Sequence, residues 1–115
     1  MLHDLVVIGS HLLLRLDPRP TAIFASNDEM AAGVYHAARQ LGLSIPDDLS
    51  VVGFDDTMVA QIAAPALTTV HQPLEESGRR AVERLVAALD DEDSQPHEER
   101  LDLRLEVRRT TAPPQ

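Results

Sequence analysis

The sequence of 115 residues predicts an α/β fold, in which a mainly parallel sheet with Rossmann-like crossovers lies in a three-layer arrangement with helices. Three short apolar runs, residues 21–25, 49–54 and 67–70, are rich in β-branched residues and are typical of strands buried on both faces of a parallel sheet. Stretches with helical periodicity lie between them. This alternation requires crossover connections, which are right-handed. A fourth strand, near the end of the chain, is expected at an edge of the sheet.

The first strand is expected at residues 21–25, directly after Pro20. Ser26 and Glu29 then match a capping box, so Ser26 is the expected N-cap of the first crossover helix. Apolar residues recur at helical spacing as far as Leu41, and Gly42 suits the C-terminal cap.

The second strand is expected at residues 49–54, after a turn at residues 46–48. Residues 57–63 predict a short helix that ends before Pro65. The third strand, residues 67–70, follows it. These two strands and the short helix form the second crossover unit of the expected sheet.

A longer helix is expected at residues 73–89, with Pro73 at its first helical position. Its apolar stripe consists of Leu74, Gly78, Ala81, Val82, Leu85 and Leu89. The acidic run 90–93 predicts a solvated loop that continues to about Glu99.

The last strand is expected at residues 101–107, where apolar and charged residues alternate strictly. Alternation with period two is typical of an edge strand with one buried face and one solvated face. Residues 110–115 are expected to form a loose tail.

The composition excludes several classes of function. The formal net charge is −9, which argues against electrostatic wrapping of nucleic acid. There is no cysteine and no lysine, so a cysteine-ligated zinc site, a phosphate-loop lysine and a Schiff base are all excluded. No metal-ligand spacing joins the histidines, and no nucleophile elbow is present. The expectation is a protein that is not an enzyme, holds no metal or cofactor and has no membrane partner.

Polar residues follow each of the three parallel strands. They are Asn27 and Asp28, then Asp55 and Asp56, then Gln72. Ligands of open parallel sheets bind beyond the carboxyl ends of the strands, and amides with carboxylates suit a neutral ligand rich in hydroxyls, such as a sugar or nucleoside. On these residues alone, the alternative is equally supported: Asn27 and Asp28 are only helix caps, and the two later aspartates only form a turn.

Several linked motifs resemble the lactose-repressor/galactose-repressor (LacI/GalR) family of bacterial transcription regulators. They are RPTAIFASNDEMAAG at residues 19–33, IPDDLSVVGFDDT at residues 45–57, PALTTVHQP at residues 65–73 and RRTTAP at residues 108–113. The resemblance covers about residues 18–113, with the motifs in the family's order.

The resemblance implies part of a periplasmic-binding-protein-like effector domain, in which two α/β subdomains enclose a cleft. Residues 18–110 match part of the C-terminal subdomain, between an atypical segment 1–17 and a tail 111–115. In relatives, the helix at 73–89 packs on the N-terminal subdomain. Positions that commonly line the effector cleft of the family match Asn27, Asp55 and Gln72, with Leu74 near them.

The resemblance also implies a homodimer, built partly through the helix after Asn27 and the short helix after Asp56. The surfaces of these helices that would meet a partner carry Ala32, His36, Val59, Ile62 and Ala63. A two-fold contact of this kind uses the same patch on both subunits.

The hypothesis that results is a truncated, cytoplasmic LacI-type regulator. It would retain the parts that bind a small-molecule effector, a sugar or nucleoside-like compound, and that dimerise. In such a chain DNA is a partner only through a helix-turn-helix domain that this sequence lacks. Two alternatives remain open: a stand-alone dimerising interaction module without a ligand, and a sugar solute-binding protein of a transporter.

Overall fold

The computed structural model describes residues 1–115. The chain divides into two compact units, which are considered separately: unit 1 comprises Met1–His71 and Arg104–Gln115, and unit 2 comprises Gln72–Leu103. The elements in chain order are α1 (Leu2–Leu14), β1 (Ala22–Phe24), α2 (Asp28–Gln40), β2 (Ser50–Asp55), α3 (Met58–Ile62), β3 (Thr68–His71), α4 (Leu74–Asp90) and β4 (Arg104–Glu106).

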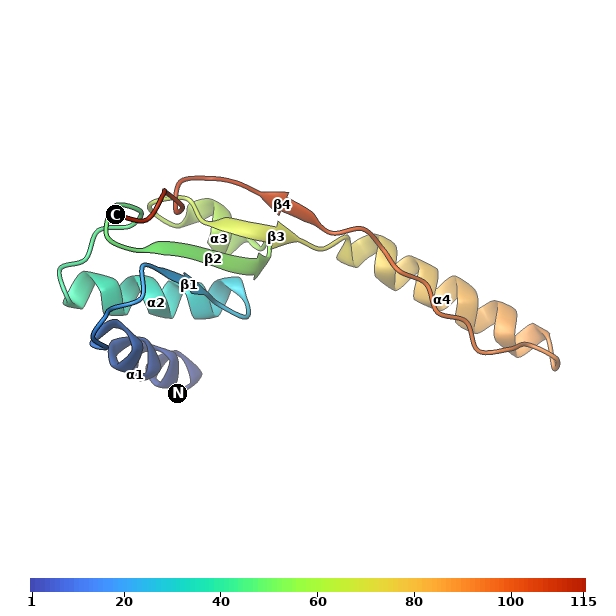
Figure 1. Ribbon diagram of the computed structural model, residues 1–115. Coiled ribbons are helices and arrows are strands. Elements are labelled where there is room, and N and C mark those ends of the chain that lie inside the picture. Colours follow the sequence, from blue (N-terminus) through green and yellow to red (C-terminus); the bar gives the residue numbers. More distant parts are fainter. The chain divides into compact units, whose positions relative to one another are not determined.

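Unit 1 is built on a four-stranded sheet in the order β1-β2-β3-β4 (Figure 1). The first three strands are parallel, and β4 pairs with β3 in the antiparallel direction at the edge. Because α2 and α3 both connect neighbouring strands in the same direction along the sheet, right-handed crossovers place them on one face, where they contact each other. The predicted α/β class, the crossovers and the edge position of the last strand are confirmed.

The core of unit 1 lies between this helical layer and the sheet. Leu49, Val51 and Leu67 are at most 1% exposed, and they meet Ala31 and Ala37 of α2, which are fully buried. Alanine at these helical positions lets α2 approach the sheet closely, because no long side chain separates the two. Burial of each large apolar side chain contributes roughly 1.5–3 kcal/mol to folding.

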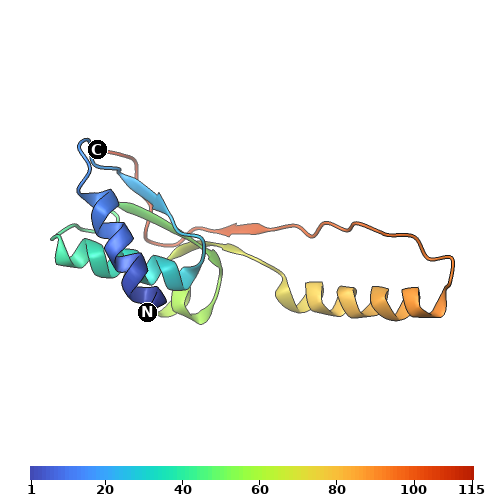
Figure 2. The same ribbon diagram turned by 90° about the horizontal axis from the view of Figure 1, so that it is seen from below.

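Helix α1 packs on α2 and forms an outer layer on the same side (Figures 1 and 2). The two helices approach closely at Gly33, where an added Cβ would lie 2.7 Å from Cγ1 of Val6. Ser10 and Leu14 of α1 are buried, whereas Leu5, Ile8 and Leu12 are more than half exposed. The segment expected to be atypical is therefore helical and joined to unit 1 by one of its faces.

The opposite face of the sheet carries exposed apolar side chains. Phe24 of β1 is 64% exposed and Leu105 of β4 is 58% exposed. The expectation that the strands are buried on both faces is wrong for this face, because both crossover helices lie on the other one.

The expected solvation pattern of the last strand is also wrong. Leu103, Leu105 and Val107 are more than half exposed, whereas Glu106 is only partly exposed. The reason is the register: Leu105 lies opposite Val70, on the face without helices. The alternation therefore predicted a strand correctly and assigned its buried face incorrectly.

The prediction of a loose tail from Thr110 onward is wrong for the start of that segment. Thr110 is fully buried. Its Oγ1 accepts a hydrogen bond from the Thr68 backbone N–H at 2.9 Å and donates one to the Val51 carbonyl at 2.6 Å. Two residues later, Ala112 exchanges hydrogen bonds with the Ser50 hydroxyl. These contacts attach the end of the chain to β2 and β3.

Unit 2 consists of α4 and the segment after it, which runs back along the helix (Figure 2). Pro73 precedes α4 as its N-cap and is not the first helical residue. No residue of α4 is buried, so its apolar stripe is exposed. Ion pairs from Arg80 and Arg84 to Glu99 join the returning segment to the helix, and these hydrogen bonds lower the pKa of Glu99. No helix in residues 1–115 is both long enough and apolar enough to cross a bilayer.

Candidate functional site

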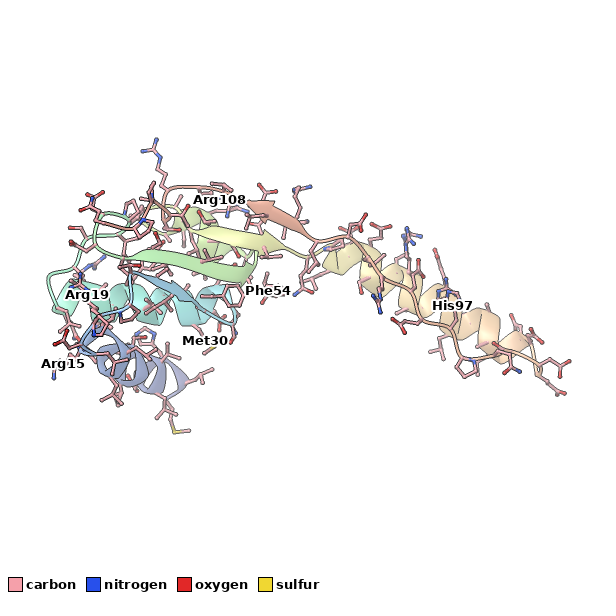
Figure 3. All side chains as sticks on the ribbon, in the orientation of Figure 1. Arg15, Arg19, Met30, Phe54, His97 and Arg108 are labelled. Carbon is pink, nitrogen blue, oxygen red and sulfur yellow. The ribbon has the colours of Figure 1, made fainter.

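The carboxyl ends of β1 and β2 lie at one edge of unit 1, because the strands are parallel. Asn27 follows β1 and Asp55 ends β2, so the structure brings these two predicted site residues to the same edge. Met30, in the first turn of α2, and Phe54, at the end of β2, mark this edge in Figure 3. Gln72 and Leu74 belong to unit 2, where Leu74 is the first residue of α4.

Asn27 is the N-cap of α2, a role predicted for Ser26. Its backbone is extended, with φ −155°, and its Oδ1 accepts a hydrogen bond from the Met30 backbone N–H at 2.8 Å. The helix begins one residue later than expected because Asn caps as well as Ser, and the amide fits the geometry at this position. The cap uses the oxygen of Asn27, so its Nδ2 is the group that could donate to a ligand hydroxyl.

Asp28, the next residue, is completely buried and serves as a hydrogen-bond acceptor for two other segments. Its Oδ2 accepts from the backbone N–H of Thr57 at 2.7 Å and from the Thr57 hydroxyl at 3.1 Å. Its Oδ1 accepts from the Thr69 hydroxyl at 2.6 Å. One carboxylate thus connects the ends of β1 and β2 and the middle of β3. Buried charges are tolerated when hydrogen bonds satisfy them in this way.

Gly53 provides the space for this carboxylate. A Cβ added at Gly53 would lie 2.4 Å from Oδ1 of Asp28 and 2.8 Å from Cδ2 of Leu67. Both distances are shorter than any ordinary van der Waals contact. The absence of a side chain at this position is therefore a requirement of the Asp28 network.

Asp55 and Asp56 form a turn with unusual backbone angles. Their φ values are 110° and 58°, a region that residues other than glycine rarely adopt. Asp56 accepts hydrogen bonds from Nη2 of Arg108 at 2.6 Å and from Nδ1 of His71 at 2.9 Å. Burial works to raise the pKa of Asp56, but these hydrogen bonds outweigh it and lower that pKa below its ordinary value.

Sequence reasoning found Asn27 and Asp55 but missed the residues that hold the neighbouring Asp28 and Asp56. Thr57, Thr69, His71 and Arg108 were not singled out, although each contacts one of the aspartates. The role of Thr69 could have been predicted, because a hydroxyl group inside an apolar strand needs a buried hydrogen-bond partner. The role of Arg108 could not, since its contact with Asp56 joins residues that are 52 positions apart in the sequence.

The five residues expected at a dimer surface lie together on unit 1. Ala32 and His36 of α2 and Val59, Ile62 and Ala63 in and after α3 all line one groove of about 270 Å³. Tyr35 also lines it, and the Tyr35 hydroxyl donates to the Pro65 carbonyl at 2.8 Å. Burial, followed by the charge of Asp28, raises the pKa of Tyr35 to about 12. Ile62 is 74% exposed, so an apolar side chain of α3 is accessible at this groove, which His3 and Arg39 also line.

Comparison with known proteins shows which family this chain matches. Residues 3–111 match the family described as periplasmic binding protein-like domain. The HTH-type transcriptional repressor PurR of Vibrio atlanticus (strain LGP32) is 40% identical over 98 residues, which are 85% of this chain and 28% of that protein. The chain therefore spans less than a third of the length of this relative.

Two solved structures are similar over nearly the whole chain. A transcriptional regulator CelR–cellobiose complex has a TM-score of 0.88 and 35% identity, over 94% of this chain and 33% of that one. A LacI family transcriptional regulator from Enterococcus faecium with bound ribose has a TM-score of 0.82 and 34% identity, over 95% and 41%. These relatives are named as regulators of transcription and not as enzymes. The chain belongs to the periplasmic-binding-protein-like domain family and matches a fragment of the effector domain of LacI/GalR-type transcriptional regulators.

Proposed function

We propose that this chain is the effector-binding and dimerising part of a cytoplasmic LacI-type regulator, with a sugar or similar polyol as its effector. The observation that carries the proposal is the position of Asn27 and Asp55 at one carboxyl edge of a parallel sheet. Structural relatives hold cellobiose or ribose, which are neutral and rich in hydroxyls. Their names as transcriptional regulators support the cytoplasmic location.

The chemistry of the two residues fits such a ligand. The Asn27 amide nitrogen donates and the Asp55 carboxylate accepts, so together they can bind hydroxyls in both hydrogen-bond directions. Hydrogen bonds between hydroxyls and a charged acceptor are the stronger kind, so Asp55 should contribute most.

Amide NMR spectra recorded during titration with D-ribose, and separately with cellobiose, test the effector site. Because the chain spans only 28–41% of the relatives, we expect weak binding, with shifts that begin at millimolar sugar. The shifts should centre on residues 27 and 55 and disappear in Asp55→Ala. Asp47→Ala, at an exposed acid of a remote turn, should retain them. Shifts that persist in Asp55→Ala would show that the site lies elsewhere.

These 115 residues are not expected to bind DNA themselves. The chain carries a net charge of −9, which opposes a polyanion. We therefore expect operator binding to require a helix-turn-helix domain, and the PurR relative is named as an HTH-type repressor. Tight, sequence-specific binding of DNA by these 115 residues alone would contradict this part of the proposal.

A second candidate function is dimerisation without a ligand, and the groove lined by residues of α2 and α3, with exposed Ile62, favours it. Ile62 at its rim is exposed to a degree that suits a subunit contact. Light scattering should report a dimer for the wild type and a monomer for Ile62→Asp. Leu85→Asp in α4 is the matched control, because Leu85 is also an exposed apolar residue but lies in unit 2. A monomeric wild type would exclude this interface.

A further inference from the structure

We infer that Asp28 is a positioning residue for the effector site: together with Arg108 it holds the Asp55–Asp56 turn in a backbone conformation that the turn would not otherwise keep. This inference rests on the proposed function, since Asp55 is its candidate ligand-binding residue. Asp28 itself contacts no ligand in this scheme, because it is completely buried.

The turn has a conformational preference that must be overcome. Side chains other than glycine disfavour positive φ, because the Cβ approaches the backbone carbonyl. Here two consecutive aspartates have φ values of 110° and 58°. Such conformations persist where the surrounding structure determines them, and they gather at functional sites. Glycine would serve folding better at both positions, so the presence of aspartates calls for another explanation.

The first anchor lies directly after the turn. Thr57 donates its backbone N–H and its hydroxyl to the same oxygen of Asp28, at 2.7 and 3.1 Å. The Asp28 carboxylate is itself held in place, because Thr69 donates a hydrogen bond to its other oxygen and Asp28 is the first residue of α2. The carboxylate also lies at the positive end of that helix, which favours its charge. The backbone that leaves the turn is thus attached to a rigid point.

The second anchor holds the turn itself. Arg108 donates from Nη2 to Asp56 and from Nη1 to the Leu67 carbonyl, at 2.6 and 3.0 Å. Its guanidinium is thereby fixed against β3 while it binds the carboxylate. His71, at the end of β3, donates to the other oxygen of Asp56. With Asp56 and Thr57 both fixed, Asp55 has little freedom in its backbone angles.

Fixing the Asp55–Asp56 turn is expected to affect the affinity for the effector more than the stability of the fold. A carboxylate on a preformed turn loses little conformational entropy when a sugar hydroxyl binds, whereas a mobile one loses more. Release of either anchor should therefore relax the turn and weaken binding, while the rest of unit 1 keeps its fold. The separation of these two effects is what a positioning role predicts and what a purely structural role does not.

NMR detects the turn directly, because positive φ brings the amide proton and Hα of one residue close together. We expect strong intraresidue NOEs at residues 55 and 56 in the wild type. In Asp28→Asn both NOEs should weaken to ordinary values, because an amide cannot accept from Thr57 and Thr69 in the same way. Thr57→Val is the second variant, in case Asp28→Asn does not fold; it removes the hydroxyl donor and keeps the backbone N–H, so both NOEs should weaken by a smaller amount. Thr57→Ser should restore the wild-type pattern, since it retains the hydroxyl.

Asp48→Asn is the matched control. Asp48 also accepts a backbone hydrogen bond, from Ser44, but in a remote exposed turn, so its replacement should change neither NOE. The response to D-ribose is measured on the same samples and should be lost together with the NOEs. If both NOEs keep their wild-type strength in Asp28→Asn, or in Thr57→Val where Asp28→Asn does not fold, the positioning role is refuted. If the wild type shows the NOEs but no ribose response, the proposed effector fails while the role of Asp28 in the turn stands.

Discussion

Replacement of Gly53 by alanine tests the close approach of β2 to the Asp28 carboxylate. The added Cβ would meet Oδ1 of Asp28 at 2.4 Å and Cδ2 of Leu67 at 2.8 Å. Leu67 can shift by rotation about its side-chain bonds, but the Asp28 carboxylate is held by three hydrogen bonds. Either the core expands, at about 1–3 kcal/mol, or the carboxylate moves and leaves a buried hydrogen bond unmade, at about 1–3 kcal/mol.

We therefore expect Gly53→Ala to lower the free energy of unfolding by about 1–3 kcal/mol. For a domain of this size that corresponds to a fall of roughly 5–20 °C in the thermal midpoint. Urea denaturation followed by far-UV circular dichroism measures the first quantity, and a thermal scan measures the second.

Gly9→Ala is the matched control in the same unit. Gly9 lies inside α1, and an added Cβ meets nothing within 4 Å. Because alanine is the better helix former, this variant should gain roughly 0.5–1 kcal/mol. If Gly53→Ala unfolds at the same denaturant concentration as the wild type, the close contact between Gly53 and Asp28 does not exist in solution.

Three further predictions concern the turn and the titratable groups. Asp55→Gly should raise the free energy of unfolding by about 1 kcal/mol, because glycine accepts positive φ, while it removes the ribose response; a loss of stability in urea would contradict the backbone argument. Tyr35 is the only tyrosine, so absorbance of tyrosinate should show its pKa near 12 in place of 10.0. Since its folded pKa is raised, stability should fall as the pH rises between these two values. For Asp56 the folded pKa is lowered, so its contribution should be complete above the unfolded pKa of 3.8 and be lost as the pH falls through the folded pKa; urea midpoints of Asp56→Asn should lack this acid-side slope.

The elements of unit 1 were predictable because each depends on local patterns. Residues 50–55 form a strand because a β-branched run lies between turn residues, and α3 begins after Thr57 and ends before Pro65, as its pattern indicates. Gly42 ends α2 with φ 69°, a backbone angle that suits glycine. In each case the determining residues lie within a few positions of the element.

What could not be predicted depends on contacts between distant segments. Whether Leu105 faces core or solvent is decided by which face of the sheet the helices cover, and the period-two pattern contains no such information. Asn27, and not Ser26, is the N-cap of α2, and this depends on the backbone geometry at a single residue. Strand ends identified Asn27 and Asp55, but the residues that hold the neighbouring Asp28 and Asp56 come from β3 and from the chain after β4.

The exposed residues of unit 2 have a consequence for proteolysis. Residues 91–100 are exposed and lie outside any helix or strand, and Arg100 offers trypsin a cleavage site there. A cut at this point would break the covalent link between residues 1–100 and the peptide that carries β4 and the end of the chain. The pairing of β4 with β3, the contacts of buried Thr110 and the bond from Arg108 to Asp56 would still hold the released peptide. The nicked protein should therefore migrate as two pieces under denaturing conditions and as one particle under native ones.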